Sequence, residues 1–145
     1  MKLIMYLMTA KYFDSSERAL WRRAVFKSKD LSLSFVLRLK KDSRFRYMQK
    51  YAILRCFMCK LKPEQITLIA NPDIYFDNML SMCYGFMNGV NMRQMRFILR
   101  EIIPNYSIAS LNTIMDMAVS GASYSELKRE AARQDANPIC ILAYL

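Results

Sequence analysis

Two cysteines three positions apart, Cys56 and Cys59 in the stretch "RCFMCK", have the spacing of half a zinc site or of a dithiol redox centre. A zinc site needs two further ligands, and because the chain contains no histidine, these would be Cys83, Cys140 or carboxylates. The other interpretation is structural, with both cysteines acting as small residues on a closely packed helix. We favour the structural role, which requires no metal ion and no cofactor.

The remaining composition argues against an enzyme. Without histidine the chain lacks a Ser-His-Asp triad, a Cys-His dyad and a zinc-binding His-Glu-x-x-His motif. Its three glycines, Gly85, Gly89 and Gly121, form no phosphate-binding loop. The carboxylate pair Asp73 and Asp77 is more typical of a solvated helix face than of an acid-base site. We therefore expect a non-enzymatic protein with no catalytic residue.

The chain of 145 residues is 54% hydrophobic and has only three glycines and four prolines, which predicts an all-α fold with a substantial core. The start "MKLIMYLMTAK" lacks an export cleavage site and is expected to form an amphipathic helix. No apolar run reaches the roughly 18 residues that span a bilayer, so we expect no integral membrane insertion. Four cysteines without an export signal indicate reduced thiols and a cytoplasmic protein.

Three consecutive segments resemble one another when aligned, namely residues 31–60, 61–89 and 90–121. Each begins with a short apolar helix, breaks, and continues into a longer helix. A period near 30 residues is typical of stacked helix pairs. We predict a short α-solenoid-like array that forms a single domain over residues 1–145. Residues 1–30 would be a degenerate first unit with helices near 2–12 and 15–28, and residues 122–145 a capping unit.

Two rows of residues follow the longer helix of each segment. The bulky seam contains Tyr47, Tyr51, Leu54 and Met58, then Phe76, Leu80, Cys83 and Met87, then Ile108, Asn112, Met115 and Val119. The small row, on nearly the opposite side, contains Ala52, Cys56 and Cys59, then Ser81, Gly85 and Asn88, then Thr113, Met117 and Ser120. Such a helix is suited to a position between two neighbours, one of which approaches its backbone closely. The third segment departs from the pattern at Asn112 and Met117.

Helix boundaries are marked by residues that commonly begin or end helices. We expect Asp42 and Ser107 as N-caps, Asn91 with Gln94 and Ser123 with Glu126 as capping boxes, Pro63 in a first turn, and Gly89 and Gly121 just past helix ends.

Positive charge is concentrated at the beginning of the chain. Residues 1–60 carry a net charge of +11, whereas residues 61–145 carry −1. Such an excess attracts polyanions, acidic proteins or anionic membranes. The candidate binding residues are Arg18, Arg22, Arg23 and Lys27 on the helix at 15–28, and Arg38, Lys40, Lys41, Arg44, Arg46 and Lys50 around the turn of the first clear repeat.

Four aromatic residues lie near these cations: Trp21, Phe26, Phe45 and Tyr47. Arginine beside exposed aromatics suits phosphate contact combined with base stacking. The alternative is that the aromatics fill the core and the cations only solvate a helix face. No known motif for reading bases is evident.

The second segment, "LKPEQITLIANPDIYFDNMLSMCYGFMNGV", resembles a degenerate repeat found in uncharacterised proteins of gut Firmicutes and their mobile elements, most clearly over residues 61–90. The resemblance implies a helical-repeat scaffold, an accessory protein, and no catalytic residue.

Our leading hypothesis is a non-enzymatic module whose basic N-terminal half engages nucleic acid or a nucleoprotein complex. The alternative is a phage or mobile-element protein-interaction module that inhibits or adapts a host protein, with an acidic protein as its partner. A third hypothesis is peripheral membrane association through the first helix and the basic region.

Overall fold

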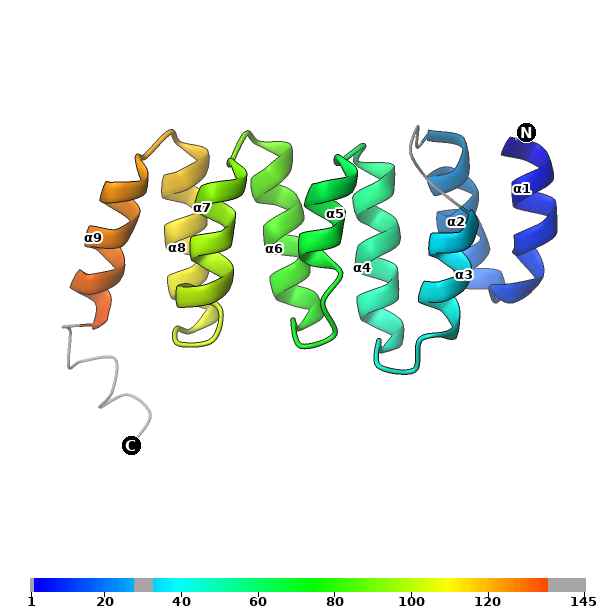
Figure 1. Ribbon diagram of the computed structural model, residues 1–145, viewed down its shortest axis with the longest axis horizontal. Coiled ribbons are helices and arrows are strands. Elements are labelled where there is room, and N and C mark those ends of the chain that lie inside the picture. The colour runs from blue at the N-terminus through cyan, green and yellow to red at the C-terminus, as the bar shows by residue number, and fades with distance from the viewer. Residues whose placement is uncertain (1, 28–32, 136–145) are drawn as a thin grey trace. The chain divides into compact units, whose positions relative to one another are not determined.

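The computed structural model describes residues 2–27 and 33–135, which contain helices and no strand, so the all-α prediction is confirmed for these ranges. The elements are α1 (Lys2–Thr9), η1 (Ala10–Tyr12), α2 (Ser15–Lys27), α3 (Leu33–Lys41), α4 (Tyr47–Met58), α5 (Pro63–Ile69), α6 (Phe76–Met87), α7 (Met92–Phe97), η2 (Ile98–Ile102), α8 (Ile108–Val119) and α9 (Tyr124–Asp135) (Figure 1). The predicted capping unit at 122–145 lies outside the described residues after position 135.

Each predicted segment contains a pair of helices. The longer helices α4, α6 and α8 have 12 residues each, and each follows a shorter one, with α7 continuing into the π-helical turn η2. Each segment thus contains a shorter helix followed by a longer one, whereas their assignment as repeats and their stacking into one array stay predictions. Internal contacts group the chain into unit 1, residues 1–83, and unit 2, residues 84–145. The single-domain prediction stays a prediction.

In unit 1, helix α2 packs against α1 and α4. Trp21 of α2 is completely buried and stacks on Phe13, with 4.9 Å between ring centroids. Helix α3 reaches α4 through an edge contact of Phe35 with Phe57 at 5.3 Å. Because α2 and α3 both contact α4, this helix forms the centre of the core of unit 1.

Gln49 connects the beginning of α4 to the turn before α6. Its Oε1 accepts the backbone N–H of Arg46 at 2.7 Å, while its Nε2 donates to the carbonyls of Pro72 at 2.9 Å and Ile74 at 2.6 Å. Figure 1 shows the α3–α4 and α5–α6 turns at the same end of unit 1. A buried amide that satisfies three backbone groups fixes these two turns to each other.

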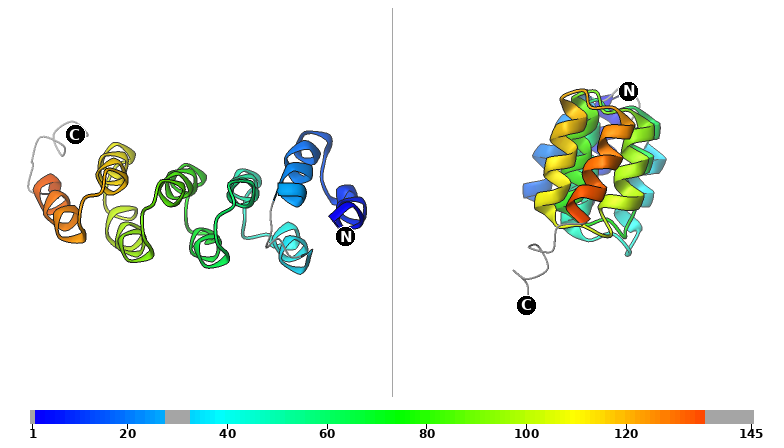
Figure 2. Two further views of the ribbon diagram at one scale, coloured as in Figure 1. Left: turned by 90° about the horizontal axis from the view of Figure 1, so that it is seen from above. Right: turned by 90° about the vertical axis from the view of Figure 1, so that its left-hand side faces the viewer.

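Gln94 has the corresponding role in unit 2. It completes a capping box with Asn91, and its Nε2 donates to the carbonyl of Ala122 at 2.8 Å. Tyr124 at the start of α9 lies under the guanidinium of Arg93, 4.4 Å from the ring centroid, and against Phe97. Helices α8 and α9 lie side by side in Figures 1 and 2 and contact each other. These contacts hold α9 against the rest of unit 2.

Most predicted boundaries are confirmed. Pro63 opens α5, and the Ser107 cap and the two capping boxes are formed. The Asp42 prediction is wrong, because α4 begins at Tyr47 and Asp42 instead closes a turn by accepting the backbone N–H of Arg44 at 3.0 Å. Gly89 and Gly121 have φ of 92° and 93°, and Lys60 occupies the equivalent place with φ of 60°. A left-handed lysine there costs about 1 kcal/mol relative to glycine.

The small row is confirmed at the centres of α4 and α6. Ala52, Cys56 and Gly85 are buried, and a Cβ on Gly85 would approach the sulfur of Met115 to 2.5 Å. The bulky seam is not buried at the ends of the helices as predicted, because Tyr47, Met87 and Ile108 are exposed. Burial in α6 instead extends to Met79, Met82 and Phe86, which lie between the two rows. An inner helix with neighbours on several sides buries more than the single stripe that the periodicity indicates.

Candidate functional site

The three described cysteines come together in unit 1. Cys83 of α6 shares side-chain hydrogen bonds with both Cys56 and Cys59 of α4, and all three are reduced. The hydrogen bond with Cys83 and burial raise the pKa of the Cys56 thiol, so Cys56 is protonated at neutral pH. Burial raises the pKa of Cys59 as well.

In this thiol cluster, a cysteine of the bulky seam meets two cysteines of the small row. The seam of α6 faces the small row of α4, so a seam cysteine contacts the small-row cysteines. The described residues contain no group of three or more Cys, Asp or Glu side chains suited to hold a metal ion, and Cys140 lies outside the described residues. Because two of the three thiols are buried, the cluster has the properties of core packing.

Five of the predicted binding residues are exposed on two helices of unit 1, and we refer to these five together as the basic surface. They are Arg22, Arg23 and Lys27 on α2, and Arg38 and Lys41 on α3. All five side chains are exposed, and none forms an ion pair with another described side chain. Among the described side chains, none therefore neutralises these five charges.

Two other predicted binding residues have structural contacts. The Nε of Arg18 donates to the carbonyls of Phe13 at 3.0 Å and Ala10 at 3.3 Å, which fixes the turn before α2. Arg44 forms an ion pair with Asp42, with 2.7 Å between Nη2 and Oδ2. The hydrogen bonds from Arg44 lower the pKa of Asp42 to about 2, so the pair stays charged at neutral pH. These two arginines are less available to a partner than the basic surface.

The remaining predicted residues differ in position. Arg46 is exposed at the start of α4, and Lys50 is half-buried and close enough to Asp42 to interact electrostatically. The side chain of Lys40 lies outside the described residues. Of the nine predicted residues whose side chains are described, only Arg44 and Arg46 line a common groove.

Arg44 and Arg46 line a groove of about 610 Å³ in unit 1, which we call the tyrosine groove. Its other lining residues are Tyr47, Met48, Gln49, Pro72, Asp73, Tyr75, Phe76 and Asp77. Tyr75 is 71% exposed and Tyr47 is also exposed. Two arginines and two carboxylates balance its charge, so the groove offers aromatic faces and hydrogen-bonding groups instead of a net positive potential.

The stacking hypothesis is wrong for two of the four aromatics and remains open for the others. Trp21 and Phe45 are buried in the core, whereas Phe26 and Tyr47 are exposed. Tyr75 is the most exposed large aromatic residue among those described, and it was not predicted from the sequence. Its position three residues after Pro72 and directly before the apolar run of α6 was the available signal, because turn residues lie at the surface.

No described helix has both the length and the apolar character needed to cross a membrane. Comparisons of the chain with protein families, curated proteins and solved structures gave no match.

Proposed function

We propose that this protein is a non-enzymatic binding module, built as an α-solenoid-like array of helix pairs, that engages nucleic acid or a nucleoprotein complex through its basic surface. The observation that carries the proposal is the exposure of five cations without an ion-pair partner among the described side chains. They belong to a stretch of 60 residues with a net charge of +11. That excess is larger than solubility requires.

Phosphate groups are the partner that this charge distribution suits best. Each cation placed against a phosphate releases a condensed counterion, and this release drives association at low salt. Unpaired cations also repel one another in the free protein, and a polyanion relieves the repulsion. Arg44 would first have to leave Asp42, so it contributes less to phosphate binding than Arg22 or Arg38.

The tyrosine groove supports an unpaired strand as the bound form. Stacking of a base on an exposed tyrosine contributes about 1–3 kcal/mol and requires a base that is free of its complementary strand. Tyr47 and Tyr75 present such rings beside Arg44 and Arg46. Asp73 and Asp77 repel phosphates but accept hydrogen bonds from base amino groups. We assign phosphates to the basic surface and bases to the groove.

Removal of three cations from the basic surface is expected to weaken binding strongly. The variant carries Arg22→Gln, Arg23→Gln and Arg38→Gln, and its affinity for a labelled single strand should fall by about 30-fold at low salt. Its matched control carries Arg96→Gln, Arg100→Gln and Arg129→Gln in unit 2, where all three arginines are exposed. Both variants lose the same charge. Fluorescence anisotropy titrations therefore show whether affinity depends on the positions of these cations or only on the net charge of the protein.

Equal loss of affinity in the two variants would contradict a defined basic surface, and so would full retention in the first. Circular dichroism checks that both variants keep their helices. A stoichiometric acidic protein that co-purifies from the source cell and survives nuclease treatment would favour the protein-interaction alternative instead.

A further inference from the structure

The first helix presents an apolar stripe to solvent. Leu3, Ile4 and Leu7 are 57%, 61% and 64% exposed, and their spacing places them on one face of α1. The helix itself is held by α2, where Tyr6 contacts Phe26 at 6.3 Å and Lys2 Nζ donates to the carbonyl of Phe26. A fixed helix with three adjacent aliphatic side chains in water has the features of a docking surface.

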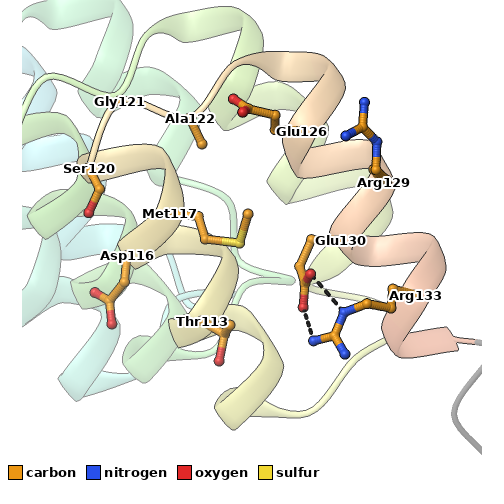
Figure 3. A pocket seen from close by; sticks show the side chains of 10 residues that line it. All are labelled: Thr113, Asp116, Met117, Ser120, Gly121, Ala122, Glu126, Arg129, Glu130 and Arg133. Atoms are coloured by element: carbon orange, nitrogen blue, oxygen red, sulfur yellow. Dashed lines mark hydrogen bonds and ion pairs between the residues drawn. The ribbon is translucent and has the colours of Figure 1, made fainter.

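A groove of about 800 Å³ lies between α8 and α9 in unit 2. Figure 3 shows Met117 directed from α8 toward α9, with Thr113 and Ser120 also on the α8 side. The carboxylates of Asp116, Glu126 and Glu130 line the same groove.

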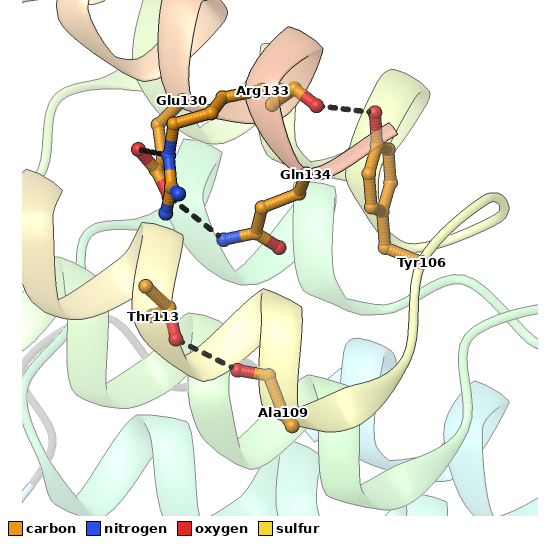
Figure 4. Close-up of polar contacts among 7 residues, drawn as sticks. Tyr106, Ala109, Thr113, Glu130, Arg133 and Gln134 are labelled. Atoms are coloured by element: carbon orange, nitrogen blue, oxygen red, sulfur yellow. Dashed lines mark hydrogen bonds and ion pairs between the residues drawn. The ribbon is translucent and has the colours of Figure 1, made fainter. Parts of the chain in front are cut away.

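The α9 wall of this groove is well supported. Tyr106 donates to the carbonyl of Ala131 at 2.9 Å, and Glu130 is held by Arg133 at 2.6 Å and by Gln134 at 3.2 Å (Figure 4). The hydrogen bonds from Arg133 lower the pKa of Glu130 to about 2. The groove therefore has a preformed shape and needs little rearrangement to accept a helix.

Helix packing elsewhere in the chain shows what such a groove accepts. In unit 1, Cys83 of one helix lies against Cys56 of the previous long helix. In unit 2, Met115 lies against Gly85 in the same way. The groove is lined by the small-row positions of α8, which correspond to Cys56 in α4 and Gly85 in α6. These positions are Thr113, Met117 and Ser120. A helix that brings medium-sized apolar side chains fits this place.

We propose that the α1 stripe of a second copy of this chain docks into the α8–α9 groove, so that copies associate head to tail. Lys2 and Lys11 flank the stripe, and residues 2–12 contain no acid. Glu130 and Arg133 neutralise each other in the groove. The other charged lining residues are two carboxylates, Asp116 and Glu126, and one cation, Arg129, so the groove has a net negative charge. Head-to-tail contact places opposite charges together, whereas contact of two α1 stripes brings lysines against lysines. This self-association goes beyond the proposed function and does not depend on it.

Two single substitutions test the contact. Leu7→Glu places a charge in the stripe, and Met117→Glu places one in the groove. Nuclease-treated wild-type protein, without added nucleic acid, is expected to exceed its monomer mass of 17.1 kDa in sedimentation equilibrium as its concentration rises through about 10⁻⁵–10⁻⁴ M. Each variant alone should stay monomeric. An equimolar mixture should form a one-to-one dimer, because the first variant keeps its groove and the second keeps its stripe.

Ile108→Glu is the matched control, since Ile108 is exposed on α8 outside the groove, and it should associate as the wild type does. A mixture that stays monomeric, or wild-type protein that is monomeric at all concentrations, overturns the proposal. Binding of α1 to anionic vesicles by monomeric wild-type protein, lost in Leu7→Glu, would assign the stripe to a membrane surface. Self-association that appears only after removal of residues 136–145 would assign the groove to that segment.

Discussion

Replacement of Gln49 with leucine is expected to lower the free energy of unfolding of unit 1 by about 3 kcal/mol, because a buried amide with three backbone partners is lost. The carbonyls of Pro72 and Ile74 would lose their donor, and leucine offers no replacement. Urea unfolding followed by tryptophan fluorescence measures the change, since Trp21 is the only tryptophan and is buried in unit 1.

Gln65→Leu is the matched control for Gln49→Leu. Gln65 is half-buried and accepts one capping hydrogen bond from the backbone of Lys62, with no hydrogen bond to a second turn among the described residues. Its replacement should cost about 1 kcal/mol or less. Equal effects of the two substitutions would mean that the hydrogen bonds from Gln49 to the 72–74 turn do not stabilise unit 1.

Replacement of Trp21 with alanine is expected to destabilise unit 1 by about 4 kcal/mol, because the ring is completely buried and stacks on Phe13. Thermal unfolding followed by circular dichroism measures this loss. Phe26→Ala on the same helix is the control and should cost far less, since Phe26 is exposed.

Trp21→Phe separates the core role of this residue from a role in binding. It keeps an aromatic side chain in the core, and it should leave nucleic-acid affinity unchanged because Trp21 has no exposed surface. A large loss of affinity in a folded Trp21→Phe protein would show that the ring reaches the bound strand.

Helix positions were predictable from sequence, whereas contacts between helices were not. Proline, glycine and capping residues mark boundaries through local backbone chemistry, and the Asn91–Gln94 box formed as expected. The reach of Gln49 to the carbonyls of Pro72 and Ile74 spans more than 20 residues along the chain, and no local rule indicates it. Asp42 failed as a cap because its carboxylate has a stronger partner in Arg44.

The positive charge of the candidate site was predictable from the sequence, but which cations are exposed and which are bound by neighbouring groups was not. Counting lysine and arginine located the basic region, since charge is additive along the sequence. Which cations are neutralised depends on neighbours in space: Arg18 is bound to backbone carbonyls while Arg22, one turn later, is exposed. The thiol cluster illustrates the same limit, because a pattern that describes one helix at a time does not show that Cys83 of α6 meets Cys56 of α4.

The salt dependence of binding by the wild-type protein tests the central claim most directly. Titration of a labelled single strand between about 50 and 200 mM salt should give a plot of log K against log salt with a slope of about −3 to −5, as expected for release of counterions by the basic surface. No binding at about 50 mM salt, or a slope shallower than about −1, would contradict the account.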